Sequence, residues 1–189
     1  MKTGISRIIF IGLILAVFGG FSPHIGAEAR NTPISVNIIV DSSQALSGVK
    51  DEITAWVNST LVEQILTEGD RVTVWSAGQT AKVVFSGRID GNPDKDEVKK
   101  SIRELSASGD SADFSGALRD AASRQQNSPF SYTLLISASP ASLSSVLTGA
   151  QADLMRFSRV EEFSGWRVLV VGLNLDARIR RSASAFLGS

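Results

Sequence analysis

The sequence predicts an α/β fold of three layers, in which a doubly wound, mainly parallel sheet lies between helices. Two observations predict this fold. Short runs of apolar, often β-branched residues alternate with longer segments whose apolar residues recur every three or four positions, which is typical of strands joined by crossover helices. The first short run ends in Asp41, Ser42 and Ser43. Polar side chains at the carboxyl end of a buried strand lie where open α/β sheets bind ligands.

The same patterns predict the elements in order. We expect strands at 34–40, 72–76, 81–85, 132–136 and 167–171. We expect helices at 46–66, at 94–105, from 113 onward, over 143–163 and at 176–187. Only Ala77-Gly78-Gln79 joins the second and third strands, and this connection is too short for a parallel crossover, so the third strand should run antiparallel to the second. Trp56 falls on the apolar stripe of the first helix, which predicts that it packs in the core.

The first 29 residues have the pattern of an export signal. Lys2 and Arg7 precede an apolar run at 8–21, and Ala27-Glu28-Ala29 matches the small residues of a signal-peptidase site. The run is shorter than the roughly 20 residues that a membrane-spanning helix needs, which favours cleavage over the alternative of an uncleaved membrane anchor. We therefore expect a signal peptide at 1–29, a single domain at 30–189, and export to the periplasm, the cell envelope or the extracellular space.

The composition excludes several classes of chemistry. The chain has no Cys, and its one His, His24, lies in the expected signal peptide. The mature domain therefore lacks the residues for Ser-His-Asp or Cys-His catalysis, thiol redox chemistry, and zinc sites built on imidazole or thiolate. Basic and acidic residues number 19 each, so no positive excess favours nucleic-acid binding. We expect protein partners and no nucleic acid.

Four fragments, in their order and spacing, resemble a von Willebrand factor A-type domain over residues 34–187. They are the end of the first strand through Ser43, Gly69-Asp70 before the second strand, Ser115-Gly116 at a helix start, and Val168-Leu-Val-Val-Gly172. The resemblance implies a sheet order of 3-2-1-4-5 with strand three antiparallel, and binding rather than catalysis. It also implies a sixth strand and a last helix, for which we find no segment. We therefore expect strand five to be an edge open to assembly with another chain.

The family that the sequence resembles holds a divalent ion at the carboxyl ends of its strands. The ligands come from an Asp-x-Ser-x-Ser motif, a Thr before the third helix and an Asp after the fourth strand. Asp41 and Ser43 match this pattern, whereas alanine stands at the other three positions, Ala45, Ala112 and Ala138. Because hard cations need oxygen ligands, we expect a degenerate metal-ion-dependent adhesion site and no cofactor. The alternative is a reduced Mg²⁺ site in which a shifted Asp113 joins Asp41 and Ser43.

We expect a non-enzymatic, metal-independent protein-interaction module that contacts its partner through the loops at the strand ends. The residues expected to make contact are Ser42, Gln44, Ser111, Asp113, Ser137 and Ser139. Their hydroxyl, amide and carboxylate groups can hydrogen-bond a partner directly. Two alternatives stay open: Mg²⁺-dependent ligand binding through the reduced site, and a structural subunit of a membrane-associated complex. An enzyme that used Asp41 would need a second catalytic group, and the ends of strands four and five offer only Ser137, Ala138 and Asn174.

Overall fold

The computed structural model describes residues 32–124, 130–139, 141–143 and 166–172, the last of these by its backbone alone. Five strands form one sheet: β1 (Ser35–Asp41), β2 (Arg71–Ala77), β3 (Ala81–Arg88), β4 (Ser131–Ser137) and β5 (Trp166–Gly172). Their order is β3-β2-β1-β4-β5. Only β3 pairs antiparallel with its neighbour. The α/β fold class and the strand order expected from the sequence are therefore confirmed.

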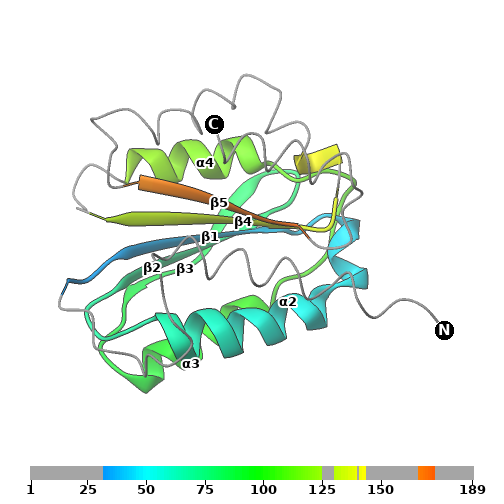
Figure 1. Cartoon of the computed structure of the whole chain (residues 1–189). Coiled ribbons are helices and arrows are strands. Elements are labelled where there is room, and N and C mark those ends of the chain that lie inside the picture. The colour runs from blue at the N-terminus through cyan, green and yellow to red at the C-terminus, as the bar shows by residue number, and fades with distance from the viewer. Residues whose placement is uncertain (1–31, 125–129, 140, 144–165, 173–189) are drawn as a thin grey trace. The chain divides into compact units, whose positions relative to one another are not determined.

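Helices cover both faces of the sheet (Figure 1). Helix α4 (Phe114–Ser123) lies on one side, and α2 (Lys50–Trp56) and α3 (Asn92–Arg103) lie on the other. The row of buried strand residues that packs with α4 includes Ile39, Trp75 and Leu135, and the adjacent row on the opposite face includes Ile38, Val74 and Leu134. Neighbouring residues of a strand point to opposite faces, so burial of both rows explains the continuous apolar runs in the sequence.

The predicted helix at 46–66 is instead three helical segments. A short 3₁₀-helix, η1 (Gln44–Gly48), precedes α2, and a π-helix, η2 (Val57–Ile65), follows it. The Leu66 N–H donates to the Leu61 carbonyl at 3.0 Å, which is the five-residue spacing of a π-turn. The wider turns bury residues four to five positions apart: Val49, Ile53, Val57, Leu61, Val62 and Leu66. Trp56 lies beside this stripe and is half-buried, so the prediction that it packs in the core was wrong.

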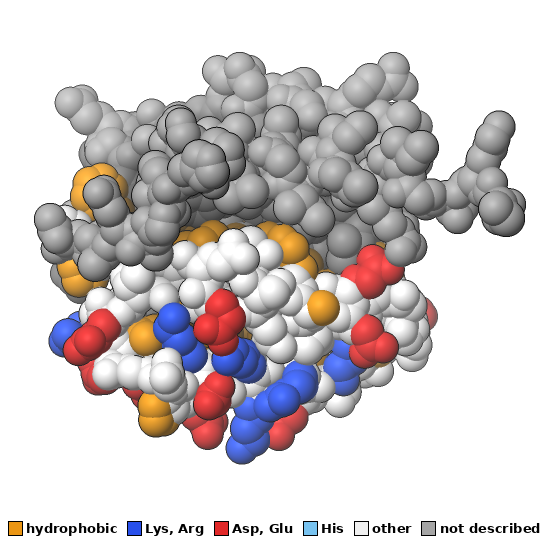
Figure 2. All heavy atoms as spheres, turned by 60° about the horizontal axis from the view of Figure 1, so that its bottom comes forward, with side chains coloured by type: hydrophobic (Ala, Val, Ile, Leu, Met, Phe, Trp, Pro, Cys, Tyr) orange, Lys and Arg blue, Asp and Glu red, His pale blue; other side chains and the backbone are white. Residues whose placement is uncertain are grey.

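Charged side chains of both signs are interspersed on the face that α2 and α3 cover (Figure 2). Lys99 of α3 pairs with Glu63 of η2 and, at 3.1 Å, with Asp96 of its own helix. The hydrogen bonds that the Lys99 ammonium donates, to Glu63 first and then to Asp96, raise the pKa of Lys99. The pair of Lys99 with Glu63 links α3 to the π-helix at the surface.

One expected strand is longer in the structure, and several expected elements lie outside the described residues. The third strand continues to Arg88, because antiparallel pairing with β2 extends through Ser86 and Gly87. The expected export signal, most of the expected helix at 143–163 and the expected helix at 176–187 lie outside the described residues, as does anything after β5 that would bear on its being an edge. In the ranges that the structure describes, no helix is long and apolar enough to cross a membrane.

Candidate functional site at the strand carboxyl ends

Asp41 ends β1 as a buried carboxylate that is only 1 % exposed. Its Oδ1 accepts a hydrogen bond from the backbone N–H of Ser43 at 2.9 Å. Its Oδ2 accepts a short hydrogen bond from the hydroxyl of Ser137. Ser137 ends β4, which runs parallel beside β1, so the carboxyl ends of the two strands meet. Both oxygens of Asp41 therefore bind donors that the chain itself supplies, as a buried polar group requires.

Ser137 continues this network into the segment after β4. Its hydroxyl oxygen accepts the backbone N–H of Ser139 at 2.9 Å. The Ser139 hydroxyl oxygen in turn accepts the backbone N–H of Ser142 at 3.2 Å and lies 3.0 Å from the Ser142 hydroxyl oxygen. Because a hydroxyl can donate one bond and accept others, the serines can link in series. The network orders the loop after β4 around Asp41.

Ser42 links β1 to β2 on the other side of Asp41. Its hydroxyl oxygen lies 2.7 Å from that of Ser76 on β2 and 3.3 Å from the Val40 carbonyl oxygen, to which it can donate. The backbone N–H of Ser42 donates to the Ala77 carbonyl at 2.9 Å. Ser42 is buried, so its side chain supports the loops from within rather than facing solvent. Ser76 was not among the predicted site residues, although a strand parallel to β1 must end at the same edge of the sheet.

Asp113 is the N-cap of α4. Its Oδ1 accepts the backbone N–H of Gly116 at 2.8 Å, which satisfies one of the unpaired donors in the first turn of the helix. Its Oδ2 accepts the backbone N–H of Ala81, the first residue of β3, at 3.2 Å. Asp113 thus joins α4 to the turn between β2 and β3, and both of its oxygens are engaged.

Backbone hydrogen bonds tie the neighbouring loops together. The donor–acceptor pairs are Ser108 N to Ser42 O at 2.8 Å, Gln44 N to Gly109 O at 2.9 Å, and Asp113 N to Gly78 O at 2.7 Å. We call the surface formed by residues 42–48, 77–80, 106–113 and 137–139 the loop face. Its segments come from four places in the sequence. The first three are bonded to one another, and the fourth is bonded through Ser137 to Asp41, the residue before the first segment.

The structure divides the predicted contact residues into two groups. Gln44 and Ser111 are exposed, together with Gln79, Thr80 and Asp110, which the sequence analysis did not single out. Ser42, Ser43 and Ser137 are buried, and Asp113 and Ser139 are half-buried. The exposed group consists of short polar side chains and amides without a Lys or Arg. Of the six residues predicted to contact a partner, Gln44 and Ser111 are therefore the two that are fully exposed.

The side chains at the expected metal site do not fit a divalent cation. Mg²⁺ prefers six oxygen ligands in a near-octahedral arrangement, usually with one or two carboxylates from the protein. Here Asp41 is bonded to Ser43 and Ser137, and Asp113 is bonded to backbone N–H groups. Ala45, Ala112 and Ala138 contribute no side-chain oxygen. Among the described residues, no three His, Cys, Asp or Glu side chains are grouped so that they could hold a metal ion.

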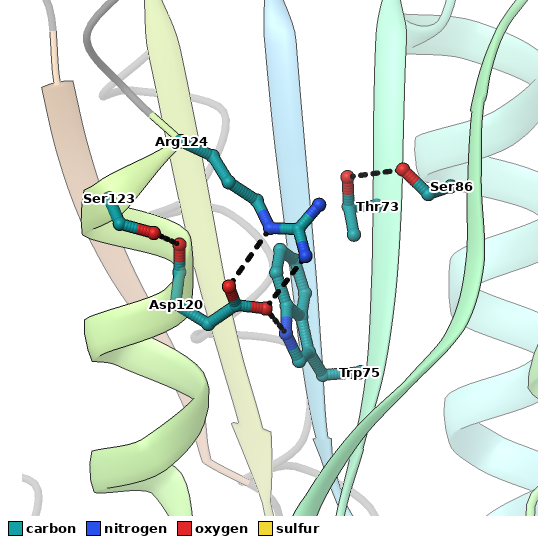
Figure 3. Close-up of polar contacts among 6 residues, drawn as sticks. All are labelled: Thr73, Trp75, Ser86, Asp120, Ser123 and Arg124. Carbon is teal, nitrogen blue, oxygen red and sulfur yellow. Dashed lines mark hydrogen bonds and ion pairs between the residues drawn. The ribbon is translucent and has the colours of Figure 1, made fainter.

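A second polar cluster lies on the α4 side of the sheet (Figure 3). The carboxylate of Asp120 accepts the indole N–H of Trp75 at 3.0 Å and two donors of Arg124, at 3.0 and 3.1 Å. The Arg124 guanidinium also lies 5.7 Å from the centre of the Trp75 ring, within cation–π range. Burial raises the pKa of Asp120. The hydrogen bonds from Arg124 and Trp75, together with the Arg124 charge, lower it by more, so the pKa of Asp120 is below its usual range.

A family model matches most of the described chain. The model is the von Willebrand factor type A domain, and it matches residues 34–161. The match therefore spans β1 to β4 and includes Asp41, Asp113 and Ser137. No curated protein matches the chain.

Solved structures of low sequence identity share the fold. The chain is similar to manganese-loaded TRAP protein from Plasmodium vivax, with a TM-score of 0.60 and 13 % identity over 84 % of this chain and 63 % of that one. It is similar to a von Willebrand factor type A protein from Catenulispora acidiphila, with a TM-score of 0.55 and 18 % identity over 82 % and 37 %. A third, proximal thread matrix protein 1 from the mussel byssus, has a TM-score of 0.54 and 16 % identity over 75 % and 38 %. The chain thus spans less than two thirds of the length of each.

Proposed function

Since the chain belongs to the von Willebrand factor type A family, we propose that it is an exported protein-interaction module that works without a bound metal. Domains of this family generally bind partners rather than catalyse reactions. In this proposal the chain acts in an envelope or extracellular assembly, and the partner contacts the exposed residues of the loop face, among them Gln44, Gln79 and Ser111. The signal-like pattern of residues 1–29 supports export.

The hydrogen bonding of Asp41 is the observation that carries the proposal. A cation in such a site would organise the loops by binding oxygens from several of them. Here the Ser137 hydroxyl and the Ser43 N–H bind the carboxylate instead, and backbone hydrogen bonds hold the loops to one another. A preorganised surface loses less entropy on binding, so a loop face held in this way can bind a partner without metal.

Calorimetry tests metal independence. The full chain is titrated with Mg²⁺ and with Mn²⁺, and its thermal unfolding is followed with and without each ion. We expect neither heat of binding nor a rise in Tm, because a ligand that binds only the folded state would raise the Tm. Saturable heat together with a rise in Tm would overturn the proposal.

That second result would favour Mg²⁺-dependent ligand binding through a reduced site. A specific observation supports this candidate: the similar structure from Plasmodium vivax is manganese-loaded. The site would use Asp41, Ser43 and Asp113, and each carboxylate would have to exchange a protein donor for the ion. Asp41→Ala should then abolish the heat, whereas Asp110→Ala, which removes an exposed carboxylate on the same face, should leave it unchanged.

Site-directed photocrosslinking tests the loop face. A photoreactive amino acid is placed at Ser111, which is exposed on the loop face, or at Glu68, which is exposed in the turn before β2 at the opposite ends of the parallel strands. We expect a crosslinked partner from the native cells with the probe at Ser111 and none with the probe at Glu68. Crosslinking at Glu68 alone would place the partner elsewhere and contradict the proposal.

A further inference from the structure

Among the described residues, the outer edge of β3 has no strand partner. β3 is the terminal strand of the sheet and pairs with β2 on its inner side. Apart from this pairing and the N–H of Ala81, which donates to Asp113, no backbone group of β3 bonds to another element of the described chain. Unpaired N–H and C=O groups along an edge can accept an additional strand. β3 has eight residues, Ala81–Arg88, and is long enough for such pairing.

A β-bulge turns an extra apolar side chain to one side of this edge. Trp75 pairs with Val83 and Val74 pairs with Phe85, so Val84 has no partner on β2. In a regular strand, Val84 and Phe85 would point to opposite faces. Here both line the same groove on the α3 side, because the bulge re-aims the side chain. Val83 stays across from Trp75, and Val83 and Val84 are 39 % and 43 % exposed.

The groove lies between β3 and α3 and has a volume of about 510 Å³. Val84, Phe85 and Leu105 contribute its apolar part. The volume falls within the range of protein pockets that hold several side-chain-sized groups. An extended segment paired along β3 would direct every second side chain toward this groove.

Three charged residues line the groove: Glu97, Lys100 and Glu104, all of them exposed. None of the three forms an ion pair with another described residue. The side of the groove formed by α3 and the residues after it therefore carries two carboxylates and one ammonium group. Lys82 is exposed on β3 across from Ser76, but it does not line the groove. A partner with a basic side chain complements the wall better than one with an acidic side chain.

We propose that β3 and this groove bind an extended segment of a partner protein, which adds as a strand to β3 and places an apolar and a basic side chain in the groove. Ser106 and Ser108 line the groove and also belong to the loop face, whereas the other residues of this surface lie outside that face. The proposal does not depend on the function proposed for the loop face. A second copy of the chain is a poorer occupant, because two facing β3 edges would bring the like-charged walls of both grooves together.

Peptide titration followed by NMR tests the proposal. The probes are two synthetic eight-residue peptides of alternating threonine and valine, one with a central lysine and one with glutamate in its place. Added at millimolar concentration to the ¹⁵N-labelled full chain, the lysine peptide should shift amide signals of β3 and of residues 97–105. Amides of residues 42–44 and 110–113 on the loop face, none of which lines the groove, should not move. The lysine peptide should bind about twofold to fivefold more tightly than the glutamate peptide, as for one opposite-charge pair.

Neighbouring valines provide matched variants. Val84→Glu puts a charge in the groove and should abolish the shifts, whereas Val83→Glu, at a similarly exposed position on the other side of the strand, should retain them. Val84→Thr, which keeps the β-branched shape, should weaken binding if Val84→Glu does not fold. The proposal is overturned if neither peptide shifts β3, if both glutamate variants lose binding equally, or if the glutamate peptide binds as tightly. A dimer of the free chain that Val84→Glu dissociates would also overturn it.

Discussion

The hydroxyl of Ser137 donates a hydrogen bond to Oδ2 of Asp41, and this bond joins the carboxyl ends of two adjacent parallel strands. Both residues are buried. The pair is therefore a structural contact between β1 and β4 at the place where the family resemblance implied a cation.

Removing the Ser137 hydroxyl should destabilise the fold. Ser137→Ala leaves one oxygen of a buried carboxylate without its donor, which costs about 1–3 kcal/mol of the free energy of unfolding. Urea unfolding followed by circular dichroism measures the change. Ser111→Ala is the control, because Ser111 is exposed, and should change stability by less than about 0.5 kcal/mol. Equal stability of the two variants would show that the bond contributes nothing.

Loss of the Asp113 cap should also destabilise the chain. Asp113→Ala removes the acceptors of the Gly116 and Ala81 N–H groups, with an expected cost of about 1–2 kcal/mol in the free energy of unfolding. Asp110→Ala removes an exposed carboxylate from the same loop and should be nearly neutral. The difference between the two variants in urea unfolding measures the cap. A similar loss in both would point to loop charge instead.

The conformation of Gly109 makes a prediction about the loop face. Its φ of +72° is in the left-handed region, and a Cβ there would lie 2.9 Å from Cγ of Gln79. Gly109→Ala should therefore cost about 1–2 kcal/mol, chiefly from the backbone. Gly48→Ala has no atom within 4 Å of the new Cβ and should be neutral or stabilising. Thermal unfolding of both variants checks the prediction, which fails if they behave alike.

The Asp120 cluster predicts a dependence of stability on pH. The pKa of the Asp120 carboxylate is lowered in the folded state from an ordinary value of 3.8, so Asp120 takes up a proton more readily in the unfolded chain. The stabilisation of the fold by the ionised Asp120 carboxylate is present above about pH 4. It is lost as the pH falls through the folded-state pKa of Asp120. Asp120→Asn should cost up to about 1 kcal/mol at neutral pH, since the pair with Arg124 is largely exposed. In urea unfolding, the difference in stability between wild type and variant should narrow as the pH falls below about 4. A gap that persists at low pH would contradict the charge effect.

Restoring oxygen donors should create a metal site if missing donors are what prevents binding. The variant Ala45→Ser, Ala112→Thr and Ala138→Asp supplies two hydroxyls and one carboxylate at half-buried positions. Calorimetry should then detect Mg²⁺ binding, with a rise in Tm that depends on ion concentration. A folded triple variant that gives no heat would show that the loop backbone, rather than the side chains alone, excludes the ion.

Most of the fold could be predicted from local patterns. The apolar runs ending at Asp41 and at Ser137 are buried on both faces, so their hydrophobicity identified them as strands. The short turn at Gly78 made an antiparallel β3 necessary. The prediction of one continuous α-helix at 46–66 was wrong, because apolar residues that recur every three to four positions are hard to distinguish, over a few turns, from residues that recur every four to five. The π-helix was therefore missed.

The sequence by itself determined the α/β class, the antiparallel third strand and the residues absent from the chain, because hydrophobic periodicity, connection length and side-chain chemistry are local properties. The strand order was implied by the resemblance to the family. The sequence also brought Asp41 and Asp113 forward as carboxylates near the strand ends. Only the tertiary structure decided what those carboxylates bind: Asp41 is paired with Ser137, 96 residues away, and Asp113 with Ala81. Hydrogen-bond partners distant in sequence depend on register and packing, which residue patterns do not encode position by position.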